Sequence, residues 1–391
     1  MAMQPHRQGV ARRSTRQLTV EEFRLSDPRV SRLLELSPLA DHTRRFRARL
    51  AAAESVERAG AIAEAEGLSL WRAACAGAAA SLSDDRALYW VRLQLTAYLR
   101  SRYAPRFALR SADRAQLIAR FEQASRGLSE LQFSASAADK RILISGFDPF
   151  RLDTAADRSN PSGAAALFLD GKYVGHGTRR AQVRAVIFPV RFRDFDGGLV
   201  ETTFRPFLEP EADGSTGVDL LVTISQNNSE GYEIEHWAGR RRTLEASDNL
   251  GQFGAHTTTR GTSEIVPLGA AGEHEFEQTS LPVEAMLRAA GALGGDHIRE
   301  NMSRLPAQGG PAVRGSGGNY LSNEVFYRAA SLERTTRRVA AIARAAVPVG
   351  HLHVPLMEPP HALTDPVAYA ARRQEIASHV KAILTAALSG L

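Results

Sequence analysis

Hydrophobic and polar residues follow different patterns in the two parts of this chain, and the change falls near residue 139. Residues 41–135 are dense in Ala, Arg, Leu and Glu, which all favour helices. From residue 139 onward, short apolar runs of strand length alternate with longer helix-like stretches. Strands separated by helices usually pair in parallel through right-handed crossovers. The pattern therefore predicts a three-layer α/β/α sandwich with a mostly parallel sheet, preceded by a helical N-terminal extension.

The same pattern gives the expected elements. Residues 1–40 are polar, Arg-rich and weakly patterned, which predicts partial disorder. We expect helices over 43–65, 68–82, 84–103 and 111–127, with Gly67 ending the first and Ser111 capping the last. Further on we expect strands over 142–145, 182–189, 220–225 and 347–354, and helices over 163–169, 197–207, 283–292, from 323 onward, and 366–388.

These patterns divide the chain into two expected domains, residues 1–138 and 139–391. The first domain carries no chemical motif, so we interpret it as a helical cap or an oligomerisation element. The second domain contains every candidate for chemistry discussed below.

Composition narrows the class of protein. No apolar run approaches the roughly 18 residues needed to span a membrane, and no apolar segment follows the basic N-terminus as in a secretory signal. Cys75 is the only cysteine, which excludes a disulfide within the chain and a cysteine-cluster metal site. The sequence therefore favours a cytoplasmic protein without a membrane segment.

The net charge of +6 raises the question of nucleic-acid binding. Residues 1–50 hold eleven Arg against five Asp and Glu, so the whole excess lies in the N-terminal tail. Only three lysines occur in the chain, and an Arg-rich, Ala-rich composition fits a general compositional bias as well as a binding surface. The charge distribution thus argues against nucleic acid as the partner.

A glycine-rich turn at residues 315–318 leads into an expected helix and places Ser322 near the start of that helix. Glycine permits a sharp turn and a close approach of the backbone to a ligand. Free N–H groups at a helix N-terminus can stabilise an oxyanion. Ser322 is therefore a candidate nucleophile, but serine is also a common helix cap, and that interpretation stays open.

Other candidates for chemistry are not specific when taken singly. His351 and His353 lie two residues apart on an expected strand and should face the same side, which would suit a metal, yet no third ligand is evident by spacing. Glu235 alternates with apolar residues and, by itself, is an ordinary strand glutamate.

The order of these residues resembles that of the pyroglutamyl peptidase I family, the cysteine peptidases that remove an N-terminal 5-oxoproline. The resemblance covers residues 139–391. Its blocks are Gly146-Phe147-Asp148-Pro149-Phe150, Asn160-Pro161-Ser162, Phe188-Pro189-Val190, Glu235-His236-Trp237-Ala238, Asp248-Asn249-Leu250-Gly251, Leu281-Pro282-Val283, the segment 316–323 and His353-Val354-Pro355.

The resemblance implies a triad of Ser322, His353 and Glu235, with Ser322 at the position of the family's cysteine. It also implies that Phe147 and Phe150 enclose the oxoproline ring, and that Gln226 and Leu321 contribute to substrate binding. A second departure is Asn227-Asn228-Ser229 in place of the family's Gly-Gly-Arg segment. Apart from substrate binding, Phe147 and Phe150 have the alternative of packing in the core.

The serine leaves three outcomes open: a working serine variant, an inactive relative that binds oxoproline-like groups, or an engineered trap. The first predicts a hydrolase that acts on a peptide or small acyl amide without cofactor or metal. A second class, a binding or scaffold protein with the helical part as its interaction module, remains the alternative, and a homo-oligomer stays open.

Overall fold

The computed structural model describes residues 17–391 except 79, 81–83, 135, 137–138, 178, 212–213, 230, 255–260, 270–272, 341–344 and 358–364. Part of the stretch expected to be disordered, residues 1–16, therefore lies outside the described residues. The prediction was wrong for the rest of that stretch, because helices α1 (Val20–Phe23) and α2 (Pro28–Leu36) form there, joined by a 3-10 turn, Arg24–Ser26. Thr19 caps α1 through a reciprocal pair of bonds with Glu22, a local signal that the polar composition concealed.

Four longer helices complete the N-terminal part: α3 (Ala40–Ala51), α4 (Val56–Gly77), α5 (Asp85–Ser101) and α6 (Ser111–Ala124). The expected break at Gly67 was wrong, because α4 continues through it. A Cβ at Gly67 would lie 2.7 Å from the Phe121 carbonyl oxygen of α6, so this glycine allows two helices to pack closely. Ser111 is the first helical residue, and Arg110 occupies the cap position instead.

The chain then forms a seven-stranded mixed sheet in the order β10-β5-β11-β4-β1-β3-β2. Four of its six strand pairs are parallel, and β5 with β11 and β2 with β3 pair antiparallel. The strands are β1 (Lys140–Phe147), β2 (Tyr173–His176), β3 (Arg179–Phe188), β4 (Leu220–Gln226), β5 (Tyr232–Glu235), β10 (Ile298–Asn301) and β11 (Val349–Val354). Two small two-stranded antiparallel sheets pair β6 (Trp237–Gly239) with β9 (Phe276–Gln278), and β7 (Arg241–Thr243) with β8 (Thr262–Glu264).

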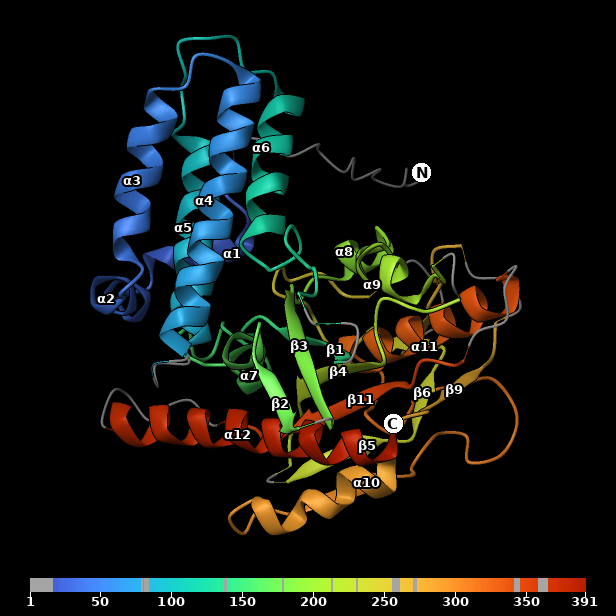
Figure 1. The fold of residues 1–391 in the computed structure, drawn as a ribbon. Helices are drawn as coiled ribbons and strands as arrows, with labels where there is room; N and C mark the ends of the chain where they lie inside the picture. Colours follow the sequence, from blue (N-terminus) through green and yellow to red (C-terminus); the bar gives the residue numbers. More distant parts are fainter. Residues whose placement is uncertain are drawn as a thin grey trace, which may run out of the picture.

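Helices cover both faces of this sheet (Figure 1), which confirms the predicted α/β fold. Alternating residues of β1 enter different cores: Ile142 and Ile144 face the core shared with α7 and α12, while Leu143 faces the core shared with α9 and α11. The helices of this part are α7 (Pro161–Leu169), α8 (Phe192–Asp196), α9 (Leu199–Leu208), α10 (Val283–Leu287), α11 (Leu321–Val339) and α12 (Pro366–Ala387), with 3-10 turns Arg288–Ala292 and Leu388–Gly390.

Helices α3 to α6 stand as an upright bundle over the end of the sheet where β1 and β3 finish, with α1 and α2 near the foot of the bundle (Figure 1). Their core is continuous with that of the sheet, because Trp71 and Leu95 belong to the same buried cluster as Ile144 and Val183. Among the described residues, no helix has the length and apolar character required to cross a bilayer.

Candidate functional site

A buried histidine–glutamate pair lies on two neighbouring strands of the sheet. His353 belongs to β11 and Glu235 to β5, and Nδ1 of His353 lies 2.6 Å from Oε1 of Glu235. In the antiparallel register, His353 stands opposite Glu233, so its bond to Glu235 runs diagonally to the next residue that faces the same side. Burial raises the pKa of Glu235, and the attraction of His353 opposes that shift. A carboxylate in this position fixes the orientation of an imidazole ring.

The other histidine, His351, faces the same side as His353, with the two rings edge to face at 4.7 Å. Each of its ring nitrogens is already within hydrogen-bonding distance of a hydroxyl, Nδ1 at 2.7 Å from Thr223 and Nε2 at 2.8 Å from Ser225. Burial, and secondarily the nearby His353, lower the pKa of His351 well below 6.5. His351 therefore serves as a neutral, hydrogen-bonded support beneath His353.

A second acidic side chain, Glu233, approaches the pair, and its spacing along the sequence did not indicate this. Glu233, Glu235 and His353 offer ligand atoms within 4.8 Å of one another, and they form the only such group in the described part of the chain. Glu233 is already engaged, since Arg299 donates to Oε1 and Asn301 donates to Oε2 at 3.2 Å. The charge of Glu233 is thus balanced by Arg299, whereas Glu235 makes its hydrogen bond to His353.

The glycine-rich turn presses against the histidine–glutamate pair. A Cβ at Gly317 would lie 2.6 Å from Cε1 of His353 and 3.3 Å from Cδ of Glu235. The next residue, Gly318, has φ +95°, which other residues adopt only with strain. Both glycines are thus required where they stand, one for close approach and one for the turn.

Helix α11 begins immediately after this turn and carries Ser322 as its second residue. Tyr320 occupies the N-cap position, so the interpretation of Ser322 as a helix cap was wrong. Asn323 fixes this end of α11 by exchanging two 2.8 Å bonds with the backbone N–H and C=O of Gly239 in β6. Ser322 is half-buried, and among the described residues its hydroxyl has no hydrogen-bond partner.

Ser322 and His353 line the same cleft, which has a volume of about 480 Å³. Next to it lies a smaller cavity of about 40 Å³, which Ser322 also lines. The remaining walls of the small cavity are mostly apolar and come from six elements or loops: Phe147, Phe150, Asn160, Val190, Ser225, Gln226, Tyr320 and Leu321.

The two phenylalanines differ in their surroundings. Phe147 is 3% exposed and packs between Phe188 and Phe195, so it belongs to the core as well as to the cavity wall. Phe150 is half-buried, and its ring stacks on Tyr320 with centroids 6.4 Å apart. Tyr320 was missed by sequence reasoning, although its place between the glycine-rich turn and Leu321 was a usable signal.

Gln226 ends β4 and is 7% exposed at the cavity wall. Neither its side-chain oxygen nor its side-chain nitrogen has a hydrogen-bond partner among the described residues. A buried amide without partners is costly unless a ligand completes its bonds. Gln226 is therefore the cavity residue with the most evident capacity to bind a polar ligand.

Asn227 and Asn228 follow Gln226 and line the outer cleft. Arg151 donates to the Asn228 side chain at 3.3 Å. The segment that departs from the pyroglutamyl peptidase pattern thus borders the cleft and not the small cavity, with Arg151 supplying the positive charge nearby.

The fold and the site together define a mixed α/β protein with a helical N-terminal extension and a buried histidine–glutamate pair beside a half-buried serine. Family models match both parts: the PA0049 N-terminal domain over residues 3–122 and the PA0049 C-terminal domain over residues 141–286. The uncharacterized protein PA0049 of Pseudomonas aeruginosa is 30% identical, over 75% of this chain and 68% of that protein. The chain belongs to the PA0049 family.

Solved structures of pyrrolidone carboxyl peptidase from Pyrococcus furiosus are also similar in part. A mutant of that enzyme is 20% identical with a TM-score of 0.44, covering 64% of this chain and 99% of the peptidase. The structure reported for that enzyme with its cysteine-free mutant gives 20% identity, a TM-score of 0.43 and the same coverage. At these values the likeness is too distant to assign an activity to this chain.

Proposed function

We propose that this protein is a hydrolase that removes an N-terminal pyroglutamyl group, or a related small cyclic acyl group, from an amine. Ser322 is the nucleophile, His353 the general base and acid, and Glu235 the residue that orients His353. The observation that carries the proposal is the 2.6 Å bond between His353 and Glu235 in a cleft that Ser322 also lines.

The chemistry of Gln226 supports the choice of acyl group. A five-membered lactam has its N–H donor and its C=O acceptor on the same side, because the ring holds the amide cis. The side-chain amide of Gln226 offers an oxygen and a nitrogen side by side, both buried and without a partner among the described residues. Two antiparallel hydrogen bonds between these amides would satisfy both groups at once. The apolar ring carbons would then contact Phe147 and Phe150.

In the reaction, Ser322 Oγ forms a bond to the acyl carbon while its proton passes to His353. The C–N bond then breaks, and the departing amine takes the proton from His353. Water hydrolyses the acyl ester by the same route in reverse, which releases the cyclic acid and regenerates the Ser322 hydroxyl. N–H groups in the first turn of α11 have no partner within the helix and would stabilise the oxyanion.

A second candidate function is ligand binding without turnover. It is favoured by one observation, the absence of any hydrogen bond to the Ser322 hydroxyl among the described residues. A hydrolase without substrate can show the same geometry, because catalytic hydrogen bonds are often loose before substrate binds, so turnover must be measured.

Turnover of pyroglutamyl p-nitroanilide separates the two. In a hydrolase, Ser322→Ala should lower kcat at least about 10³-fold. The matched control is Ser331→Ala, which removes a buried serine nine residues further along α11 and should retain activity. Turnover by Ser322→Cys alone would identify the serine as a block. If neither the natural chain nor Ser322→Cys turns over, but 5-oxoproline binds, the binding function is correct.

A further inference from the structure

The N-terminal helical unit, residues 20–126, contacts a loop beside the small cavity through buried ion pairs. Asp148 follows β1 and begins a loop over residues 148–160, the pocket loop, which carries Phe150 and ends at Asn160. Arg92 of α5 and Arg126, just beyond α6, both donate to the Asp148 carboxylate, the latter at 2.7 Å. All three side chains are at most 3% exposed.

The same helix also holds the other end of the pocket loop. Asp85, the first residue of α5, accepts a bond from the hydroxyl of Ser159 and a 2.7 Å bond from the backbone N–H of Asn160. The Asn160 side chain in turn donates to the Asp148 carbonyl at 3.0 Å. Asp85 and Arg92 are seven residues apart, which is about two helical turns, so they lie on the same face of α5. That face therefore contacts both ends of the pocket loop.

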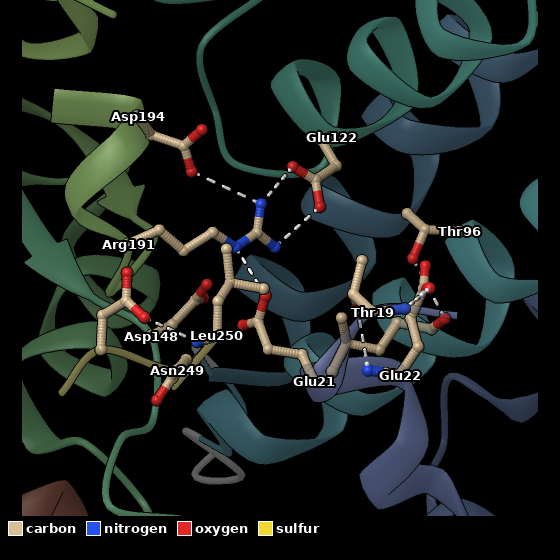
Figure 2. Close-up of polar contacts among 12 residues, drawn as sticks. Thr19, Glu21, Glu22, Thr96, Glu122, Asp148, Arg191, Asp194, Asn249 and Leu250 are labelled. Carbon is tan, nitrogen blue, oxygen red and sulfur yellow. Dashed lines mark hydrogen bonds and ion pairs between the residues drawn. The ribbon is translucent and has the colours of Figure 1, made fainter. Parts of the chain in front are cut away.

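A second set of contacts fixes the neighbouring wall. Arg191 follows Val190, which lines the cavity, and Figure 2 shows its guanidinium between Glu21 of α1, Glu122 of α6 and Asp194. The bonds to Glu21 and Glu122 are 2.6 and 2.9 Å long. Asn249, near Arg191 in the same view, donates to the Pro149 carbonyl at 2.8 Å and so ties the pocket loop to this wall.

This network is poorly explained as a device for stability alone. Two buried side-chain nitrogens of Arg126 and one of Arg92 have no hydrogen-bond partner among the described residues. Buried ion pairs contribute little net stability compared with apolar side chains of the same volume, and incomplete ones contribute less. What the pairs do supply is a fixed direction for the Asp148 carboxylate, two residues before Phe150.

We propose that the helical unit is a positioning element of the acyl pocket, in which Arg92 and Arg126 are positioning residues that hold the pocket loop through Asp148. The proposal rests on the proposed function for the identity of the ligand, but not for the effect on the loop. It replaces the interpretation of the helical part as a separate interaction module.

The test uses full-length Arg92→Met, which keeps the aliphatic volume and removes the charge, and Arg92→Lys, which restores the charge. Hydrogen–deuterium exchange reports the loop directly, and the KM for pyroglutamyl p-nitroanilide reports the pocket. We expect exchange in residues 148–160 to rise at least about tenfold in Arg92→Met. KM should rise by a similar factor with a smaller change in kcat, and Arg92→Lys should recover part of both.

Glu66→Gln is the matched control. Glu66 lies on α4 of the same unit, is 2% exposed, and binds His42 at 2.8 Å and Arg49 at 3.2 Å, without contact to the pocket loop. It should alter exchange in α3 and α4 and leave both the pocket loop and KM unchanged.

Several outcomes would overturn the proposal: unchanged loop exchange in folded Arg92→Met, an increase spread evenly over the chain, or a mobile loop with unchanged KM. If Arg92→Met does not fold, the double variant Arg92→Met/Asp148→Asn removes the cation and the anion together. Raised loop exchange in that variant supports positioning, and exchange like that of the natural chain refutes it. Raised loop exchange in a protein without any turnover would support positioning while rejecting the hydrolase.

Discussion

Replacing Gly317 by alanine should separate the candidate base from its glutamate without unfolding the protein. The new Cβ would lie 2.6 Å from Cε1 of His353, whereas ordinary contact begins near 3.4 Å. The ring or the turn must therefore move by about 0.8 Å, the difference between these distances. Gly317 lacks the left-handed φ of Gly318, so the effect comes from this contact and not from backbone strain.

A displacement of this size has a predictable magnitude. Moving a catalytic group by about 1 Å costs on the order of 10²-fold in rate. Overpacking of this kind usually costs about 1–3 kcal/mol of unfolding free energy, which most domains tolerate. We therefore expect folded Gly317→Ala with kcat reduced about 100-fold.

Two measurements check this prediction. The rate on pyroglutamyl p-nitroanilide reports catalysis, and the downfield proton resonance of His353 Nδ1 reports the bond to Glu235 independently of any activity. Gly318→Ala is the control, because its Cβ would meet nothing within 4 Å although its φ of +95° is strained. It should lose stability and keep the Nδ1 resonance. Folded Gly317→Ala with the resonance of the natural chain would refute the reasoning.

Three further outcomes follow from the same geometry. Phe150→Ala should raise KM by about tenfold or more and lower the unfolding free energy by less than about 2 kcal/mol, since the ring is half-buried and stacks on Tyr320; equal losses in calorimetry and kinetics would favour a core role. Burial and the neighbouring Asp84 raise the pKa of Asp85 to about 6 from 3.8. The stability of the natural chain relative to Asp85→Asn should therefore fall by about 2 kcal/mol between pH 4 and 7 in urea titrations, and a rise would contradict this. Gly67→Ala should lower the melting temperature despite its better helix propensity, because its Cβ would lie 2.7 Å from α6; a higher melting temperature would show that the helices separate at little cost.

The four central strands, β11, β4, β1 and β3, could be predicted because each is a largely buried apolar run, whereas the edge strands β2 and β10 are mostly exposed or half-buried and were not expected. The expected strand over 220–225 matches β4, where every residue is buried, and the expected helix over 366–388 matches α12 closely. The antiparallel pairing of β5 with β11 could not be predicted, because no pattern within either strand indicates its partner or its direction.

The N-terminal helices were harder to divide correctly. Gly67 has the local properties of a helix end, and only its close contact with Phe121 of α6 explains why α4 continues through it. In the same way, the helix cap before α11 is Tyr320, which has no side-chain oxygen in a capping bond. Helix boundaries that depend on tertiary contacts are therefore the ones that propensity misplaces.

The residues of the candidate site could be predicted from the sequence, but the buried ion pairs that hold its walls could not. Ser322, His353 and Glu235 stand in recognisable motifs, and all three lie at or beside the cleft, although the roles of these residues stay predictions. Arg92 stands in an otherwise apolar stretch, Trp90-Val91-Arg92-Leu93, and an arginine among buried residues was a signal that could have been used. Its partner Asp148, 56 residues away, could not be identified from that signal.

The bond between His353 and Glu235 has a consequence for how the chain can vary. The two residues are 118 positions apart in the sequence, and the backbone pairing of β5 with β11 brings them together. Insertions or deletions in the surface turn at residues 303–311, between these strands, would leave the pair where it is. The length of this turn can therefore vary while the sheet keeps His353 and Glu235 in contact.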